Sequence, residues 1–326
     1  MTVLVTGGAG YIGSHTVRRL VKHQRDVVVL DSLEFGDKNR VFDVPLFVGD
    51  VADSRIIDKI CRKYDISEVI HFAAYKAVGE SMEQPLRYYN NNVSGTIALV
   101  LALLSNGVNR FVFSSSAAVY GTPTTVPISE DADLHPESVY AETKVVVEKF
   151  LASCSAVGLR SVCLRYFNAA GASSDASIGE DWSMSQNLVP LIMKAMLGQS
   201  DIFSLNGIDY PTPDGTCIRD YIHVEDLADA HTKALEYLER GGSTLACNVG
   251  TGVGHSVLEV IAMVEAVSGR KVPYQIVGRR LGDPASGYAD PTLIQQSLGW
   301  KPTQDLRDII SSAWRWHSKL AITPPR

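Results

Sequence analysis

Short apolar runs alternate along the first half of the chain with segments whose apolar positions recur at helical spacing. The runs that we interpret as strands cover residues 3–5, 27–31, 46–48, 69–73, 111–113 and 161–165. The segments that predict helices between them cover residues 11–23, 54–64, 93–106 and 140–154. These strands are apolar along most of their length instead of alternating, which is typical of a parallel sheet that is covered on both faces. The pattern therefore predicts an α/β fold.

The pattern changes after residue 168. Residues 169–187 are rich in Gly, Ala, Ser and Asp, which indicates a loop and a candidate domain boundary. Further helices are predicted at about 187–198, 224–240, 256–268 and 304–319, with only short strands between them. We expect a dinucleotide-type domain at residues 1–168, to which residues of about 216–250 return, and a smaller lobe at 169–326. The length of 326 residues fits two such units.

Composition and charge narrow the class of protein. Hydrophobic residues make up 45% of the chain and charged residues 20%, values that exclude an intrinsically disordered chain. The formal net charge of −6 argues against a general nucleic-acid binder but leaves room for an anionic ligand in a local basic pocket. The longest apolar run, residues 97–104, is too short to cross a membrane, and no signal peptide is recognised, so we expect a soluble cytoplasmic protein.

Cysteine and histidine positions argue against disulfides and a metal site. The five cysteines are odd in number and none are in CxxC spacing, so we expect buried, reduced thiols. They are Cys61, Cys154, Cys163, Cys217 and Cys247. The eight histidines contain no HxH, HxxxH or HExxH pair, so no metal is expected.

A glycine-rich turn connects the first predicted strand to the first predicted helix. Its sequence is Gly-Gly-Ala-Gly-Tyr-Ile-Gly at 7–13, and such a turn lets a pyrophosphate approach the backbone at a helix N-terminus. Asp31 ends the second predicted strand, where a carboxylate accepts hydrogen bonds from an adenosine ribose and repels a 2′-phosphate. The motif therefore predicts a dinucleotide site that prefers NAD to NADP. Asp50, after the third strand, either contacts the adenine or caps a helix.

Tyr140 and Lys144 stand one helical turn apart, so their side chains share one face. A nearby ammonium favours the phenolate, and we expect it to lower the pKa of Tyr140. Such a tyrosine takes a proton from a sugar hydroxyl while hydride leaves the same carbon. Ser114 to Ser116 directly follow the fifth strand, where catalytic groups of doubly wound sheets gather. The alternatives are turn-capping serines and a surface Tyr–Lys pair.

Together these residues resemble the extended short-chain dehydrogenase/reductase superfamily, and within it the 4-epimerases of UDP-glucose and UDP-galactose. Similar segments span nearly the whole chain, among them Lys-Ala-Val-Gly-Glu-Ser at 76–81 and Arg-Asp-Tyr-Ile-His-Val at 219–224. The resemblance implies a Rossmann-type doubly wound parallel sheet, a smaller mixed α/β lobe that binds a UDP-sugar, and a tightly held NAD. It also implies that Tyr140 removes the proton of the 4-hydroxyl, Ser116 is the catalytic serine, and Lys144 binds the nicotinamide ribose. A transient 4-keto sugar would then take hydride back on its other face.

The resemblance further implies two sets of binding residues. The cofactor set is Gly7, Gly10, Tyr11, Ile12, Gly13, Asp31, Ser32, Asp50, Val51, Phe72, Ala73, Ala74, Lys76, Asn92, Ser114, Tyr140, Lys144 and Tyr166. The substrate set is Lys76, Ser116, Tyr140, Asn168, Asn187, Leu188, Arg219, Tyr221, Arg280, Asp283 and Gly287. Relatives also pair the helices at about 93–106 and 139–157 with their copies, which predicts a homodimer.

Three departures from the family pattern bear on specificity. The segment 140–144 reads Tyr-Ala-Glu-Thr-Lys instead of Tyr-Gly-Lys-Ser-Lys, which keeps the tyrosine and the lysine. Asn206 stands near the position of an aromatic residue that stacks on uracil in relatives. Gly287, or Ser286 if the register slips by one, stands where several bacterial relatives carry a tyrosine beside the sugar's 2-substituent. The pocket is therefore predicted to admit N-acetylhexosamine nucleotides as well.

Other functions on the same scaffold stay open. Epimerases of UDP-xylose, UDP-arabinose or UDP-glucuronate and a UDP-glucuronate decarboxylase share the motifs named above. A 4,6-dehydratase carries an Asp-Glu pair after the catalytic hydroxyl residue, where this chain has Ala117 and Ala118. A non-catalytic NAD-binding protein is disfavoured because Tyr140 and Lys144 are both present.

Overall fold

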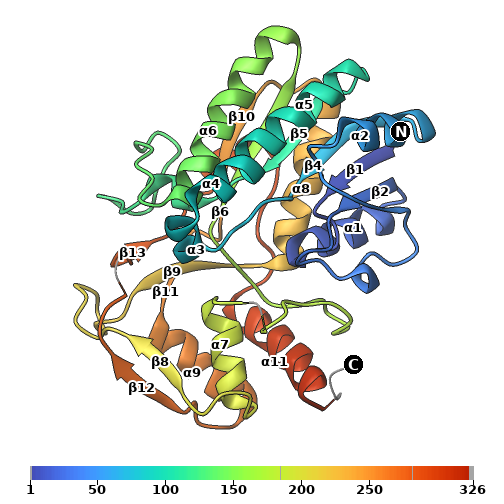
Figure 1. Ribbon diagram of the computed structural model, residues 1–326. Helices are drawn as coiled ribbons and strands as arrows, with labels where there is room; N and C mark the ends of the chain where they lie inside the picture. The colour runs from blue at the N-terminus through green and yellow to red at the C-terminus, as the bar shows by residue number, and fades with distance from the viewer. Residues whose placement is uncertain (1, 184, 281, 323–326) are drawn as a thin grey trace.

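A parallel sheet of seven strands, in the order β10-β6-β5-β4-β1-β2-β3, organises the larger part of the molecule (Figure 1). The strands are β1 (Thr2–Thr6), β2 (Asp26–Asp31), β3 (Leu46–Val48), β4 (Ile66–His71), β5 (Arg110–Ser114), β6 (Arg160–Tyr166) and β10 (Leu245–Val249). The computed structural model describes residues 2–183, 185–280 and 282–322. The strand order reverses between β1 and β4, which is the switch point of a Rossmann-type sheet. The predicted fold class is confirmed.

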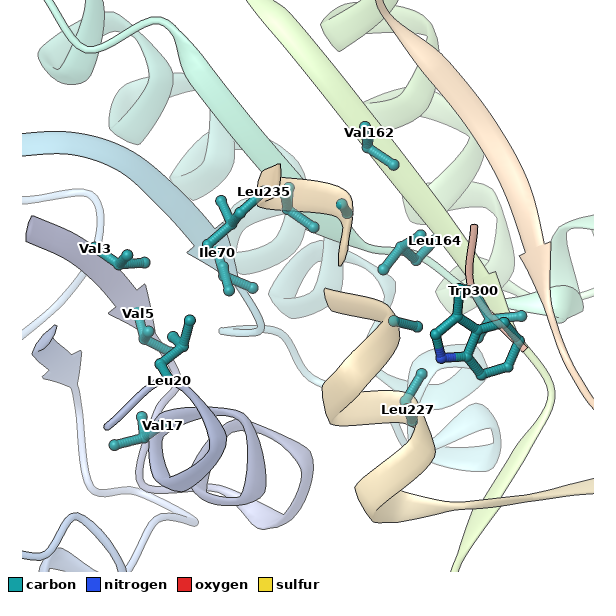
Figure 2. Close-up of a cluster of buried hydrophobic side chains, with 14 of the residues drawn as sticks. Val3, Val5, Val17, Leu20, Ile70, Val162, Leu164, Leu227, Leu235 and Trp300 are labelled. Atoms are coloured by element: carbon teal, nitrogen blue, oxygen red, sulfur yellow. The ribbon is translucent and has the colours of Figure 1, made fainter. Parts of the chain in front are cut away.

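Helices cover both faces of this sheet, which explains why its strands are apolar without alternation. One face carries α1 (Tyr11–Lys22) and α8 (Val224–Glu239), and the other carries α2 (Ser54–Lys63), α5 (Gly95–Ser105) and α6 (Val139–Ser153). Successive strand residues point to opposite faces. Val3 and Val5 therefore pack with α1 and α8, as Figure 2 shows, while Leu4 packs with the helices of the other face.

Short helices lie in the connections between the strands. They are α3 (Val78–Glu83), α4 (Pro85–Tyr88), and the 3₁₀ turns η1 (Lys38–Arg40), η3 (Ala117–Tyr120) and η4 (Cys154–Val157). A π-helical segment, η2 (Tyr89–Ser94), continues directly into α5, so the helix predicted at 93–106 is part of a longer helical run. π-Helical turns are often found at functional sites.

The lower part of the molecule in Figure 1 is a mixed α/β lobe with its own core. Its strands are β7 (Asn168–Ala170), β8 (Phe203–Asn206), β9 (Ile218–His223), β11 (Gly254–Ser256), β12 (Tyr274–Val277) and β13 (Ser286–Gly287). Its larger helices are α7 (Leu188–Met196), α9 (Val257–Ser268) and α11 (Leu306–Ile322). The short helix α10 (Thr292–Leu298), which packs back on α8 and β10, was not predicted.

The chain passes more than once between the two parts. After the lobe strand β9, α8 packs on α1 and β10 pairs with β6. The predicted division at residue 168 stays a prediction. Cys163, Cys217 and Cys247 are buried, whereas Cys61 and Cys154 are half-buried, so full burial was wrong for these two. Within the described ranges, no helix is both long and apolar enough to cross a membrane.

Candidate active site

The turn between β1 and α1 forms a cradle of backbone atoms in which positions 7 and 13 have no room for a side chain. Gly7 has a φ of +71°, and a Cβ there would lie 2.6 Å from the backbone nitrogen of Ala73. A Cβ on Gly13 would lie 2.2 Å from the carbonyl oxygen of Gly7. Gly10 occupies the N-cap of α1 without a capping side chain, so the first N–H groups of the helix face outward from the turn. This cradle fits the pyrophosphate of a dinucleotide.

Asp31 sits at the end of β2 beside the cradle. Its carboxylate accepts hydrogen bonds from the backbone nitrogens of Ala9 and Leu33, each at 2.9 Å. The carboxylate thus fixes the glycine turn while it lines the adjoining groove. Asp50 lines the same groove, and the cap of α2 is Asp53, which accepts from the backbone nitrogen of Arg55 at 3.0 Å. The helix-capping alternative for Asp50 is therefore wrong.

The groove runs along the carboxyl ends of β1, β2, β3 and β4. Predicted cofactor residues that line it are Gly7, Gly10, Asp31, Ser32, Asp50, Val51, Phe72, Ala73 and Ala74. Lining residues that the sequence analysis missed are Glu34, Phe35, Gly36, Gly49, Tyr75 and Asn91. Tyr75 and Asn91 adjoin predicted positions in the sequence, whereas Phe35 lies in a loop without a motif. Described cofactor candidates outside the lining are Tyr11, Ile12, Gly13, Lys76, Asn92, Ser114, Tyr140, Lys144 and Tyr166.

Tyr140, Lys144 and Ser116 converge at the carboxyl end of β5. Ser138 caps α6 by accepting from the backbone nitrogen of Ala141 at 3.2 Å, which fixes the helical turn that carries Tyr140. The Lys144 ammonium lies 5.7 Å from the centre of the Tyr140 ring and donates to the carbonyl oxygen of Ser114 at 2.8 Å. A hydrogen bond joins the side chains of Ser116 and Tyr140. The surface-pair alternative is wrong, because both Tyr140 and Lys144 are buried.

Burial dominates the electrostatics of this group. It raises the pKa of Tyr140 well above its ordinary value, while the hydrogen bond with Ser116 lowers that pKa. Burial also lowers the pKa of Lys144 to about 8, which Glu148 one turn further along α6 partly opposes. The expectation of a depressed pKa for Tyr140 is therefore wrong for the protein alone, because desolvation of the phenol outweighs the lowering contribution, which comes from Ser116.

Asn92 supports the site from the π-helical segment. Its amide accepts from the backbone nitrogen of Tyr75 at 2.9 Å and donates to the hydroxyl of Thr143 at 3.1 Å. The Thr143 hydroxyl in turn donates to the carbonyl oxygen of Tyr140 at 2.7 Å. Ser81, which the sequence analysis did not single out, accepts from the backbone nitrogen of Tyr140 at 3.1 Å. These contacts fix the backbone of Tyr140 on two sides.

Predicted substrate residues gather in the lobe around β9. The Arg219 guanidinium lies 3.6 Å from the Asp283 carboxylate, and Gly287 pairs with Arg219 between β13 and β9. Asp220 instead faces the interior and accepts from the backbone nitrogens of Thr251 and Gly252. Arg219 therefore has Asp283, and not its sequence neighbour Asp220, as its carboxylate partner.

Five further substrate candidates lie in the same lobe. Tyr221 is buried on β9 beside Asn168 of β7, with which it is in register. Asn187 and Leu188 start α7, and Arg280 is exposed. Asn206 ends β8 and is exposed.

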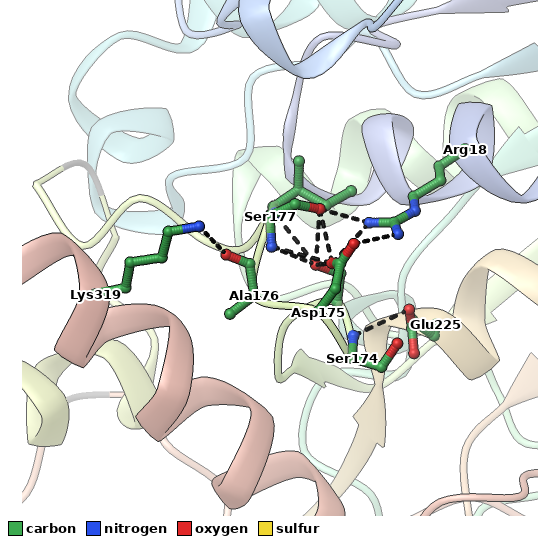
Figure 3. Close-up of polar contacts among 9 residues, drawn as sticks. Arg18, Ser174, Asp175, Ala176, Ser177, Glu225 and Lys319 are labelled. Carbon is green, nitrogen blue, oxygen red and sulfur yellow. Dashed lines mark hydrogen bonds and ion pairs between the residues drawn. The ribbon is translucent and has the colours of Figure 1, made fainter.

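Residues 171–183, here called the strap, lead from β7 toward α7. The Asp175 carboxylate accepts from the Arg18 guanidinium of α1 at 3.0 and 2.6 Å, and Lys319 of α11 donates to the carbonyl oxygen of Ala176 at 3.1 Å (Figure 3). Tyr11 donates to the carbonyl oxygen of Gly171 at 2.7 Å. The strap is thus tied to both parts of the molecule.

The family model, the sequence relatives and the solved structures that this chain matches all belong to one family. Residues 3–250 match the model of the NAD dependent epimerase/dehydratase family. A UDP-glucose 4-epimerase from Halalkalibacterium halodurans is 47% identical over 98% of this chain and 96% of its own. A crystal structure of UDP-glucose-4-epimerase from Stenotrophomonas maltophila with bound NAD and formylated UDP-arabinopyranose has a TM-score of 0.95 and 42% identity, covering 98% of this chain and 99% of that one. The UDP-glucose 4-epimerase from Brucella ovis in complex with NAD has a TM-score of 0.94 and 44% identity, covering 97% and 98%.

Proposed function

The chain belongs to the NAD dependent epimerase/dehydratase family, and we propose that it is an NAD-dependent isomerase that interconverts UDP-glucose and UDP-galactose. The convergence of Ser116, Tyr140 and Lys144 at the sheet edge that carries the glycine cradle supports this reaction. A base beside a dinucleotide site removes the proton of a hydroxyl group while the dinucleotide accepts the hydride from the same carbon. Return of the hydride to the other face of the resulting 4-keto sugar inverts that carbon.

The chain's own residues divide the work as follows. The glycine cradle and Asp31 would hold the dinucleotide. The phenolate oxygen of Tyr140 takes the proton of the sugar 4-hydroxyl and returns it at the end of the cycle. Ser116 orients that proton transfer through its hydrogen bond with Tyr140. Lys144 places a positive charge beside the phenol and would bind the ribose of the cofactor. When bound, oxidised NAD supplies the acceptor for the carbon-4 hydride and a positive ring charge that favours the phenolate.

The reaction is tested by following UDP-galactose conversion by NMR. Wild-type protein is expected to produce UDP-glucose, and Tyr140→Phe, which keeps the ring and removes the hydroxyl, is expected to lower kcat by roughly 10²–10⁴. Equal NAD content in both proteins serves as the control. Absence of epimerisation in the wild type, or full activity in Tyr140→Phe, would reject the assignment.

We further propose that the site admits N-acetylhexosamine nucleotides. A Cβ at Gly287 would meet no heavy atom within 4 Å, so open space surrounds this position next to Arg219. The Gly287→Tyr variant is expected to fold and to keep its turnover of UDP-galactose. Its turnover of UDP-N-acetylglucosamine is expected to fall at least roughly tenfold, because the tyrosine fills the space for the 2-substituent. Ser286→Tyr tests the alternative register, because neighbouring strand residues face opposite sides. Loss of both activities, or of neither, in Gly287→Tyr contradicts the proposal.

Assembly, location and domain roles complete the proposal. We propose a cytoplasmic homodimer in which α5 and α6 pair with their copies. The support is apolar surface on this side, where Leu86 of α4 is 84% exposed and Leu101 of α5 is 59% exposed. NAD would be held mainly by residues 1–168 and the UDP-sugar mainly by residues 169–326.

A further inference from the structure

Two loops stand on either side of the glycine turn. In the main sheet β1 lies between β2 and β4, so the loops that follow β2 and β4 flank the turn that follows β1. Glu34 and Phe35 lie in the loop after β2, and Tyr75 lies in the segment after β4. All three residues line the groove beside the turn. A contact between these two loops therefore crosses the groove.

Side chains from the two loops meet across the groove. The Tyr75 hydroxyl donates to one oxygen of the Glu34 carboxylate at 2.8 Å. The rings of Phe35 and Tyr75 stand edge to face, with their centres 5.9 Å apart. The Asn92 side chain accepts from the backbone nitrogen of Tyr75 at 2.9 Å and donates to its carbonyl oxygen at 3.1 Å. The loop after β2 is thus joined to a residue whose own backbone is fixed.

Arg87 of α4 completes this contact. Its guanidinium donates to the other oxygen of Glu34 at 2.6 Å and lies 4.3 Å from the centre of the Tyr75 ring. The same guanidinium donates to Glu80 of α3, whose second oxygen accepts from the hydroxyl of the buried Tyr88 at 2.8 Å. An isolated surface ion pair contributes little to stability, but here two carboxylates and an aromatic ring orient one guanidinium.

We propose that Glu34, Tyr75 and Arg87 form a clasp that closes the groove over the bound dinucleotide and slows its release. The inference rests on the proposed function, in which hydride leaves the sugar and later returns to it. The chain must therefore retain one cofactor molecule from the first transfer to the second, since escape between them would leave a 4-keto sugar behind. The glycine cradle provides affinity from one side of the groove, whereas a contact across the groove has to break before a bound molecule leaves.

An argument from charge alone makes the opposite prediction for Glu34. A dinucleotide carries a negatively charged pyrophosphate, so an isolated carboxylate at Glu34 would repel it and an isolated guanidinium at Arg87 would attract it. If only these charges mattered, neutralising Glu34 would prolong the retention of NAD. If the clasp matters, the same change weakens both contacts that Glu34 makes across the groove, and it shortens retention.

The test measures the release of isotopically labelled NAD from the holoprotein in the absence of any sugar. Labelled protein is diluted into excess unlabelled NAD, and the label that stays on the protein is followed over time. Arg87→Met, which keeps the aliphatic stem, is expected to release the label roughly fivefold faster than the wild type. Glu34→Gln, and Tyr75→Phe, which keeps the ring and loses the hydroxyl, are each expected to release it roughly threefold faster.

The double variant shows whether these residues act together. In Glu34→Gln with Arg87→Met, the increase should be smaller than the product of the two single increases, because both changes break the same contact. Arg55→Gln is the matched control, because this exposed arginine of α2 pairs with Asp53 outside the clasp, and it should release the label as the wild type does. If Arg87→Met does not load NAD, Arg87→Lys, which keeps the charge but not the planar guanidinium, replaces it.

The sign of the Glu34 effect decides the outcome. The proposal is overturned if Glu34→Gln retains the label as long as the wild type or longer, or if the two single increases multiply in the double variant. A wild type that retains NAD through this clasp but does not epimerise UDP-galactose would overturn only the proposed function.

Discussion

Single glycines decide whether the first turn of the sheet can form at all. At Gly13 the obstacle is steric, because the added carbon would meet the carbonyl oxygen of Gly7 and the Cα of Gly8, neither of which is the end of a flexible side chain. At Gly10 the nearest heavy atom would be 3.3 Å away, a contact that a small shift relieves. Steric exclusion of a Cβ atom therefore explains the glycine at position 13 but not the glycine at position 10.

We predict that Gly13→Ala destabilises the protein by about 2–3 kcal/mol and removes bound NAD, because the turn must open to admit the methyl group. Gly10→Ala is the matched variant and should retain most of the stability. Thermal unfolding and the absorbance of released nucleotide measure both effects. Equal thermal midpoints for the two variants would contradict the steric argument.

The difference between Tyr140 and Glu180 of the strap shows what sequence reasoning reaches at this scale. Tyr140 and Lys144 are four residues apart on one helix, so their contact follows from helical spacing. Glu180 contacts Lys76 across 104 positions, and that contact exists only after β4, the strap and α11 have come together. The raised pKa of Tyr140 was likewise missed because it depends on burial, which spacing does not reveal.

At the scale of elements, His71 ties β4 to its neighbours. Its Nδ1 lies 2.6 Å from the Thr6 hydroxyl of β1, and its Nε2 lies 2.9 Å from the Thr96 hydroxyl of α5. Because Thr96 donates its proton to the carbonyl oxygen of Asn92, its oxygen accepts from Nε2, and Nδ1 accepts from Thr6. A neutral imidazole therefore satisfies every partner, and burial lowers the pKa of His71 to about 3.

The lowered pKa of His71 predicts that the protein loses stability at acidic pH. Folded His71 binds fewer protons than unfolded His71 between pH 6.5 and about 3, so the stability that this residue contributes falls as the pH falls through this window. Relative to His71→Gln, the wild type should lose about 1.6 kcal/mol of unfolding free energy between pH 6.5 and 5. Urea unfolding at several pH values measures the difference. The role of burial would be refuted if the stability of His71→Gln changed with pH as steeply as that of the wild type.

Regular elements were predicted where their periodicity was strong. Six of the seven strands of the main sheet, and helices such as α8 and α9, were predicted from apolar runs and helical spacing within a few residues, whereas β10 was not predicted as a strand. The π-helical segment at 89–94 was not foreseen, because its geometry depends on how Asn92 engages Tyr75 and Thr143. The helix α10 was missed because it has only seven residues.

At the scale of the whole molecule, the exposed side of α4 and α5 predicts how copies meet. Leu101→Glu places a charge in the proposed interface and should shift the protein to a monomer at micromolar concentration. Analytical ultracentrifugation measures the mass. Ile276→Glu, at a 54% exposed apolar position on β12 of the lobe, should leave the assembly unchanged. A monomeric wild type, or a dimeric Leu101→Glu protein, would contradict the predicted dimer.

The late return of the chain to the first sheet has a consequence for how the protein is made. β6 is complete at residue 166, but its partner β10 is synthesised only at 245–249, and Trp300 enters the same core still later (Figure 2). On the ribosome, the nascent sheet therefore keeps an open edge and an uncovered apolar face until most of the chain has emerged. A gene fragment that ends at residue 168 would encode this unfinished sheet, whose edge invites aggregation.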